Sequence, residues 1–347
     1  MPTPTTRSTF EAEIRQQPDV VAAALAVGRA PIAEAAEAIT SRQPAALLIA
    51  ARGSSDHAAT YAKYLFEIRN SLPVVLAAPS VFGLYKGKPN LARFCVLAVS
   101  QSGASPDVCS VIEAAREQGS LTIALTNQPK SRLARAAEMV LEMHAGKERS
   151  VPASKTYTTS LLALAMLSQA MQPKADFAQA LERVPEALRQ TIALSSPLQQ
   201  AAGEMGGTRM AVIGRGYHLA TAEELALKIT ETSYSVADGQ SVADFMHGPV
   251  AMVEPGFPVL LLEAAGPTLR QMRQLGAALV DKGAHVLAFT DRPGRSGRPL
   301  VIKTGLPESL TPLPYAVAGQ LLALHRALSL GLDPDHPRGL QKVTQTN

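Results

Sequence analysis

Short apolar segments alternate with longer stretches of helical periodicity along most of the chain. Many of these segments are closed by Gly, Ser or Pro, and they lie near residues 46–51, 73–78, 94–100, 120–126, 139–142, 210–214, 258–263, 284–290 and 300–303. Buried strands that alternate with amphipathic helices are typical of a parallel sheet whose two faces are covered by helices. The pattern therefore predicts an α/β protein.

The predicted strands form two similar series. LLIAARGSS at 47–55 aligns with MAVIGRGYH at 210–218, and GSLTIALTNQP at 119–129 aligns with GAHVLAFTDRP at 283–293. Repetition of a whole strand-and-helix unit predicts two similar α/β subdomains in tandem. We place the parts of the chain as follows: a helical arm at 1–40, subdomains at 41–195 and 196–333 joined near 195–208, and a tail at 334–347.

Composition narrows the class of protein. With 347 residues, 46% of them hydrophobic, the chain can bury a large core. The net charge is +4, but the basic residues are scattered and do not by themselves indicate nucleic acid, so we expect a solvated surface and no nucleic-acid partner. Cys95 and Cys109 have neither CxxC spacing nor nearby histidines, so we expect buried thiols and no metal site. Neither a signal peptide nor an apolar stretch of about 18 residues is seen, so we expect a cytoplasmic protein without a membrane partner.

Polar residues crowd the end of the apolar segment 94–99, where the sequence continues as SQSGASPD. In an open parallel sheet, ligands bind beyond the carboxyl ends of the strands, where the next helix presents free N–H groups to an anion. A Gly-Ser-Ser cluster at 53–55 follows an earlier strand in the same way. The candidate phosphate-binding side chains are Ser55, Ser100, Gln101, Ser102 and Ser105. The alternative is that each cluster is only a helix cap and turn.

The repeat favours a ligand over turn chemistry alone. Where the first copy has SQSGAS at 100–105, the second has EAAGPT at 263–268, so only one copy kept the hydroxyls. The chain has no GxxxxGK[ST] motif, and Gly53 lacks the GxGxxG pattern with an acidic residue about 20 positions later. A small monophosphate therefore fits the loop better than ATP or NAD.

Candidate proton-transfer residues lie in a later segment. Glu224, Lys228 and Glu231 are spaced by four and three residues, which places them along one helix face. They predict either a surface ladder of ion pairs or a partly buried carboxylate that carries a proton. His247 stands in a Met-His-Gly-Pro turn and Lys342 in a polar tail. A lone histidine is usually structural and most such tails are disordered, so the pattern alone gives neither a role.

Taken together, these motifs resemble the sugar isomerase (SIS) domain family, in particular the isomerase half of glucosamine-6-phosphate synthase and its free-standing relatives. The likeness covers nearly the whole chain. Its segments in chain order are EIRQQP at 13–18, ARGSS at 51–55, SQSGASPD at 100–107, SVPASKT at 150–156, ALKITETSY at 226–234, HGP at 247–249 and DHPRGLQKVT at 335–344. The resemblance implies two tandem SIS subdomains, each a flavodoxin-like three-layer αβα unit with a parallel sheet.

The resemblance also implies residue roles. The phosphate of a hexose 6-phosphate would be held by the serine clusters, with further substrate contacts or support from Val151, Glu224 and Lys228. Glu231 would move a proton between C1 and C2 of the open-chain sugar, and Lys342 would form a Schiff base with the ketose. His247 would open the sugar ring from the neighbouring subunit, which implies a homodimer.

The expected activity is that of a SIS-type glucosamine-6-phosphate deaminase, which yields fructose 6-phosphate and ammonia without a metal or other cofactor. The glutamine-hydrolysing domain of the synthase is missing and Met1-Pro2 offers no cysteine nucleophile, so glutamine is not the expected nitrogen donor. Alternatives are a fructosamine-6-phosphate deglycase, a galactosamine-6-phosphate deaminase, an ammonia-dependent synthase and a plain aldose–ketose isomerase. A phosphosugar sensor is disfavoured because residues 1–40 are too short and too acidic for a DNA-binding helix-turn-helix module.

Overall fold

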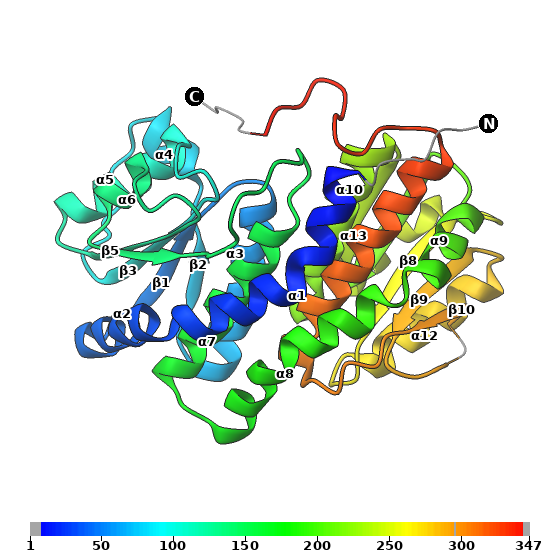
Figure 1. Cartoon of the computed structure of the whole chain (residues 1–347), viewed down its shortest axis with the longest axis horizontal. Helices are drawn as coiled ribbons and strands as arrows, with labels where there is room; N and C mark the ends of the chain where they lie inside the picture. The colour runs from blue at the N-terminus through cyan, green and yellow to red at the C-terminus, as the bar shows by residue number, and fades with distance from the viewer. Residues whose placement is uncertain (1–7, 295, 343–347) are drawn as a thin grey trace. The chain divides into compact units, whose positions relative to one another are not determined.

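The structure, a computed structural model, describes residues 8–294 and 296–342. The ends of the expected arm and tail, at 1–7 and 343–347, lie outside the described residues. Internal contacts divide the chain into two compact units, each described here by itself. The N-sheet unit comprises residues 19–147 and 156–182, and the C-sheet unit comprises the described residues up to 18, then 148–155 and 183–342. Each contains one sheet of five parallel strands (Figure 1), which confirms the predicted α/β class.

The sheet of the N-sheet unit has the strand order β2-β1-β3-β4-β5. The strands in that order are Val74–Leu76, Ala46–Ala50, Phe94–Val99, Leu121–Thr126 and Met139–Glu142. The helices are α2 (Arg29–Arg42), α3 (Ser54–Asn70), α4 (Pro79–Gly83), α5 (Pro106–Glu117) and α6 (Arg132–Ala136). The three central strands are buried almost throughout, with α4 and α5 packed on one face. Burial on both faces explains why these strands read as continuous apolar runs.

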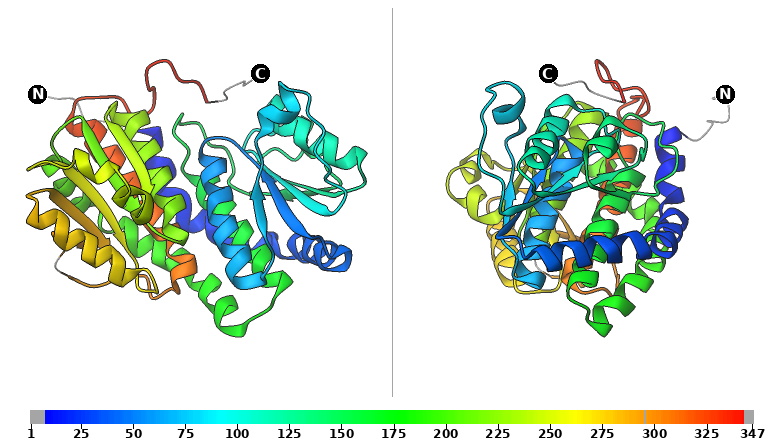
Figure 2. Two further views of the ribbon diagram at one scale, coloured as in Figure 1. Left: turned by 180° about the vertical axis from the view of Figure 1, so that it is seen from behind. Right: turned by 90° about the vertical axis from the view of Figure 1, so that its left-hand side faces the viewer.

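The sheet of the C-sheet unit has the strand order β10-β9-β8-β6-β7. The strands in that order are Arg298–Val301, His285–Thr290, Pro258–Glu263, Arg209–Gly214 and Val236–Ser241. The helices are α9 (Ser195–Glu204), α10 (Tyr217–Ser233), α11 (Val242–Met246), α12 (Leu269–Asp281) and α13 (Pro312–Ser329), with 3-10 turns at Pro249–Met252 and Glu308–Leu310. In Figure 2, α12 in gold and α13 in orange lie on opposite faces of this sheet. Three more helices belong in part to each unit, namely α1 (Thr9–Val27), α7 (Lys155–Met171) and α8 (Ala175–Ile192).

The two sheets repeat the same connectivity. Counted from the first strand of each copy, both have the order 2-1-3-4-5, which is the flavodoxin-like order. The repeat extends to single backbone angles, because Gly53 before α3 has φ 56° and ψ −134°, and Gly216 before α10 has φ 60° and ψ −129°. Only glycine adopts such a conformation without strain, so the strand-to-helix junction requires glycine in both copies.

One strand, β7, was not predicted from the sequence. Its residues VADGQS are mostly polar, and its single larger apolar side chain, Val236, is 65% exposed. β7 pairs with β6 alone, at the edge of its sheet. An edge strand with little burial carries no apolar run, so periodicity does not reveal it.

The remaining expectations concern cysteines, metals and membranes. Cys95 and Cys109 are buried free thiols, and burial raises the pKa of Cys95 to about 12. Within residues 8–294 and 296–342, no group of three His, Cys, Asp or Glu side chains is arranged to hold a metal ion. Nor does this part of the chain contain a helix with the length and apolar character needed to span a bilayer.

Candidate active site

The serine loop, residues 100–105, lies at the carboxyl edge of the sheet in the N-sheet unit. It joins β3 to α5, and Ser55 lies in the first turn of α3, directly after β1. Because β1 and β3 are neighbouring parallel strands, with Ala50 opposite Ala98, both serine clusters lie at the same edge. The strand order reverses between β1 and β3. A crevice opens at such a switch point, where open α/β sheets bind their ligands.

Several of the loop hydroxyls also shape the turn. Ser100 Oγ accepts the Gly103 N–H at 3.2 Å, and Ser102 Oγ accepts the Ala104 N–H at 3.3 Å. Ser105 is the N-cap residue of α5. A hydroxyl that accepts one hydrogen bond still has its own proton to donate. The turn role and the ligand role are therefore compatible for Ser100 and Ser102.

An ion pair joins the two sides of this edge. The Nε and Nη2 atoms of Arg52 lie 2.8 and 2.7 Å from Asp107 Oδ2, which links the end of β1 to the first turn of α5. The hydroxyl of Ser105 donates to Asp107 Oδ1 at 2.7 Å. Asp107 is only 4% exposed, so the serine loop is held by a buried carboxylate that the sequence analysis did not single out.

The equivalent edge in the C-sheet unit is lined by carboxylates instead of hydroxyls. Glu263 ends β8, Asp291 follows β9, and Glu308 begins the 3-10 turn before α13. Burial raises the pKa of all three carboxyl groups. The Glu308 carboxylate fills the space that a side chain at Gly266 would need. Among the described residues, this edge therefore presents carboxyl groups where the edge of the N-sheet unit presents hydroxyl groups.

A buried charge cluster lies on α10 of the C-sheet unit. Lys228 is 1% exposed, and its Nζ lies 2.5 Å from Glu231 Oε2 and 3.6 Å from Glu224 Oε1. Burial lowers the pKa of Lys228, but the charges of Glu224 and Glu231 outweigh burial, so the pKa lies above its ordinary value. The surface-ladder interpretation is therefore wrong for Glu224 and Lys228. The Glu231 side chain is 20% exposed and is the member of the cluster that a ligand can reach.

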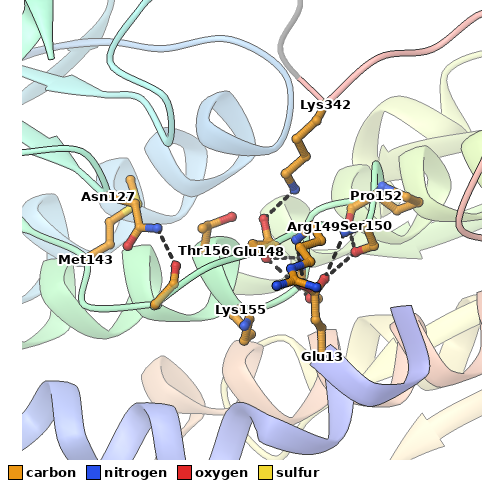
Figure 3. A network of polar contacts seen from close by, with 12 residues as sticks. Glu13, Asn127, Met143, Glu148, Arg149, Ser150, Pro152, Lys155, Thr156 and Lys342 are labelled. Atoms are coloured by element: carbon orange, nitrogen blue, oxygen red, sulfur yellow. Dashed lines mark hydrogen bonds and ion pairs between the residues drawn. The ribbon is translucent and has the colours of Figure 1, made fainter. Parts of the chain in front are cut away.

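Lys342 reaches a second buried carboxylate of the same unit. Its Nζ lies 2.6 Å from Glu148 Oε2, while Glu148 Oε1 accepts the backbone N–H of Ser154 at 3.0 Å (Figure 3). The Glu148 side chain is fully buried and that of Lys342 is 22% exposed. Glu148 also contributes to the raised pKa of Lys228. The tail lysine and the α10 cluster therefore belong to one electrostatic network.

Val151 and His247 lie in two further loops of the C-sheet unit. Val151 is part of the segment 148–155, three residues after Glu148. His247 is exposed at the C-terminal cap of α11, where its backbone N–H donates to the carbonyl of Asp244 at 3.0 Å. Among the described residues, no side chain of this chain pairs with its imidazole. The imidazole is thus free to meet a ligand or another molecule.

The structure brings many of the sequence candidates into two groups. Ser55 and the serine loop share one sheet edge of the N-sheet unit. In the C-sheet unit, Lys342 pairs with Glu148, whose charge acts on Lys228 of the α10 cluster. Within the described residues, the imidazole of His247 contacts neither group. Glu148 was missed because it is a single acid between Lys147 and Arg149, where charge pattern indicates solvent exposure. Its place two residues before SVPASKT was the available signal.

Comparison with known proteins gives consistent relatives. The model of the SIS domain family matches residues 42–170 and 207–297. Curated relatives include the isomerizing glutamine–fructose-6-phosphate aminotransferases of Thermococcus kodakarensis, 33% identical over 95% of this chain and 56% of the relative, and of Pyrococcus horikoshii, 32% identical over 85% and 51%. The chain thus spans about half the length of these relatives.

Solved structures show the same arrangement. A Silicibacter pomeroyi DSS-3 protein assigned as a phosphosugar isomerase is 36% identical, with a TM-score of 0.87 over 95% of this chain and 100% of that one. The glucosamine-6-phosphate deaminase of Thermotoga maritima is 22% identical, with a TM-score of 0.79 over 98% and 100%. At that lower identity the likeness concerns the fold alone.

Proposed function

Because the chain belongs to the SIS domain family, we propose that it is a phosphosugar enzyme, and specifically that it deaminates glucosamine 6-phosphate to fructose 6-phosphate and ammonia. The observations that carry the proposal are two ion pairs of the C-sheet unit, Lys342–Glu148 and Lys228–Glu231. The charge of Glu148 contributes to the raised pKa of Lys228. An amine and a reachable carboxylate are the two groups that this reaction requires. The curated relatives, named for amino transfer to fructose 6-phosphate, support the substrate class.

The serine clusters take the phosphate in this proposal. Ser100 and Ser102 retain hydroxyl protons that a phosphate oxygen can accept. Ser55 and Gln101 are further proposed donors, and Ser105 joins them by exchanging the hydrogen bond from its hydroxyl to Asp107 Oδ1 for one to the phosphate. A phosphate held in this way fixes one end of the sugar.

Glu231 carries the proton in the first chemical steps. His247 opens the sugar ring, which suits a group that titrates near neutrality. Glu231 then removes the proton from C2 of the open-chain aldehyde and returns it to C1, which leaves an imine at C2. One carboxylate on a rigid helix can serve adjacent carbons, and the ion pair with Lys228 holds it in place.

Lys342 acts on that imine. Its amine attacks C2 and ammonia leaves, so the sugar becomes an imine of Lys342; water then hydrolyses this imine and releases fructose 6-phosphate. An ammonium is not a nucleophile, so Lys342 must first lose a proton, and Glu148 at 2.6 Å is placed to accept it. Overall, one water is consumed and one ammonia is released.

The test measures both products from glucosamine 6-phosphate in deuterated water. We expect equal amounts of ammonia and fructose 6-phosphate, with deuterium at C1 of the ketose to the extent that the proton held by Glu231 exchanges with the solvent before it reaches C1. Glu231→Gln lowers the rate by about 10²- to 10⁴-fold, as for loss of a general base, whereas Glu254→Gln, an exposed control in the same unit, leaves it unchanged. Absence of ammonia from glucosamine 6-phosphate would falsify the proposal, and ammonia from galactosamine or fructosamine 6-phosphate instead would favour the corresponding alternative.

Amination is the second candidate, favoured by the names of the curated relatives. Fructose 6-phosphate with ammonium chloride would give glucosamine 6-phosphate through the same intermediates in reverse. Initial rates in the two directions, measured at equal sugar concentrations and one pH, separate the candidates. If the aminosugar forms faster than fructose 6-phosphate does, even without a large excess of ammonium, the chain would be assigned to synthesis.

A further inference from the structure

Helix α1 contacts the loop that carries Glu148. Within the C-sheet unit, the Glu13 carboxylate accepts the Arg149 N–H at 2.6 Å, the Ser150 N–H at 3.2 Å and the Ser150 hydroxyl at 2.5 Å (Figure 3). Glu13 is 4% exposed, and its donors are the two residues that follow Glu148 directly. The carboxylate of Glu13 therefore fixes the backbone next to the partner of Lys342.

The same helix also contacts the tail that carries Lys342. The two carboxylate oxygens of Asp335 accept the N–H groups of Thr9 and Phe10 at 2.6 and 2.7 Å. These first N–H groups of a helix have no partner within it, and a negative charge is favourable at that end. A second anchor follows, where the Arg338 guanidinium lies 3.9 Å from the ring centre of Tyr234.

The far end of the loop is held by the next residues of α1. Lys155 Nζ donates to Gln16 Oε1 at 2.9 Å. Gln17 Nε2 donates to Gln320 Oε1 of α13 at 2.7 Å, and Gln320 Nε2 donates to the carbonyl of Ser154 in the loop at 3.5 Å. Gln17 and Gln320 are fully buried. The segment EIRQQP thus contacts both ends of the loop 148–155, and none of these side chains takes part in the proposed chemistry.

We propose that Glu13 and Asp335 are positioning residues. Glu13 holds the loop 148–155 against α1 and Asp335 holds the tail against the same helix, and together they keep Lys342 beside Glu148. The Glu13 side chain lies one helical turn from the N–H groups that Asp335 accepts, so a single rigid turn fixes both partners. The catalytic meaning of this register rests on the proposed function, whereas the contacts themselves do not.

The activity test uses two isosteric variants, Glu13→Gln and Asp335→Asn. Each replaces one accepting oxygen by an amide nitrogen, which leaves a backbone or hydroxyl donor without its acceptor. Misplacement by about 1 Å costs on the order of 10²-fold in rate, so we expect kcat to fall by about 10- to 100-fold with KM within about twofold. The double variant should lose less than the product of the two single losses, because both act on one contact.

Two control variants change acidic residues of the same unit. Glu11→Gln changes the same helix, where Glu11 pairs with Arg15 at 2.9 Å, and Asp281→Asn changes an exposed aspartate at the end of α12. We expect both controls to keep the wild-type kcat. If Glu13 has only a structural role, Glu13→Gln will lower the melting temperature, but kcat will not fall selectively while KM stays nearly unchanged.

Hydrogen exchange tests the positioning without any turnover. In the unliganded wild-type protein, the amides of Arg149 and Ser150 should exchange slowly because they donate to Glu13, and Glu13→Gln should accelerate them at least about tenfold. Trypsin cleavage after Arg149 should accelerate in parallel. Wild-type exchange in Glu13→Gln, or unchanged kcat in both variants, would overturn the proposal. If the wild-type protein has no turnover, the proposed function fails, but the exchange result still tests the positioning role. If Glu13→Gln does not fold, Asp335→Asn gives the same test through hydrogen exchange of peptides from the tail.

Discussion

Lys228 and Glu224 form an ion pair on α10 whose side chains are 1% and 0% exposed, with Nζ and Oε1 3.6 Å apart. Removal of one charge leaves the other buried without compensation, which typically costs about 3–5 kcal/mol. We therefore expect Lys228→Met to lower the free energy of unfolding by about that amount in urea titrations. Lys63→Met, which breaks the exposed Lys63–Glu67 pair, should cost less than about 1 kcal/mol. Equal losses in the two variants would contradict the buried network.

The proposed homodimer with a shared site leads to a complementation experiment. His247→Asn and Glu231→Gln should each be inactive as pure homodimers. If His247 serves the Glu231 of the partner subunit, mixed dimers contain one intact site, and an equimolar exchanged mixture regains about a quarter of the wild-type activity. A mixture as inactive as its components would place both residues of a site in one chain. Light scattering before and after mixing verifies that the proteins are dimers.

The buried His218 predicts a pH dependence of stability. Burial lowers its pKa to about 3, while the ring contacts Thr311 Oγ1 at 2.9 Å and packs 4.7 Å from Tyr315. Below about pH 6.5, His218 binds a proton in the unfolded chain but stays neutral in the folded protein, so the free energy of unfolding falls as the pH falls from 6.5 toward 3. Between pH 7 and 5 the loss attributable to His218 is about 2 kcal/mol.

His218→Gln isolates this contribution in urea titrations at the two pH values. The nearby carboxyl groups of Glu263, Asp291 and Glu308 have raised pKa values, so their protonation favours the folded state as the pH falls. They are present in both proteins and largely cancel in the comparison. The variant should lose about 2 kcal/mol less than the wild type between pH 7 and 5; the same loss in both proteins would show that His218 does not titrate as expected.

Gly53 predicts a purely conformational cost. An added Cβ would meet no atom within 4 Å, but the φ of 56° with ψ of −134° is strained for any other residue. Gly53→Ala should therefore destabilise the protein by about 1–3 kcal/mol. Gly203→Ala, equally open but in helix α9, should be neutral or stabilising by up to about 1 kcal/mol. Chemical denaturation of both variants measures the contrast.

Much of the fold could be predicted from the sequence because burial leaves a mark on strand composition. The nine predicted strands correspond to observed ones, since central strands of covered sheets are continuous apolar runs. β7 escaped prediction because Val236 and its neighbours lie at an exposed edge. The repeat could be recognised in the sequence because both copies need a glycine, Gly53 or Gly216, for the backbone conformation at the strand-to-helix junction.

The candidate site was predictable only where several polar residues stand together in the sequence. The serine loop and the α10 acids are local patterns, whereas the role of Glu148 depends on Lys342, 194 positions away. Likewise, Glu13 meets Ser150 only through the tertiary fold. Long-range pairs between single charged residues leave no periodic or local signal, so their partners emerge only in three dimensions.

The acid-lined edge of the C-sheet unit leads to an expectation about sugars that carry two phosphates. The carboxyl groups of Glu263, Asp291 and Glu308 line this edge, and the Glu308 carboxylate occupies the space beside Gly266. We therefore expect a sugar bisphosphate to find no second anchor in this copy of the repeat.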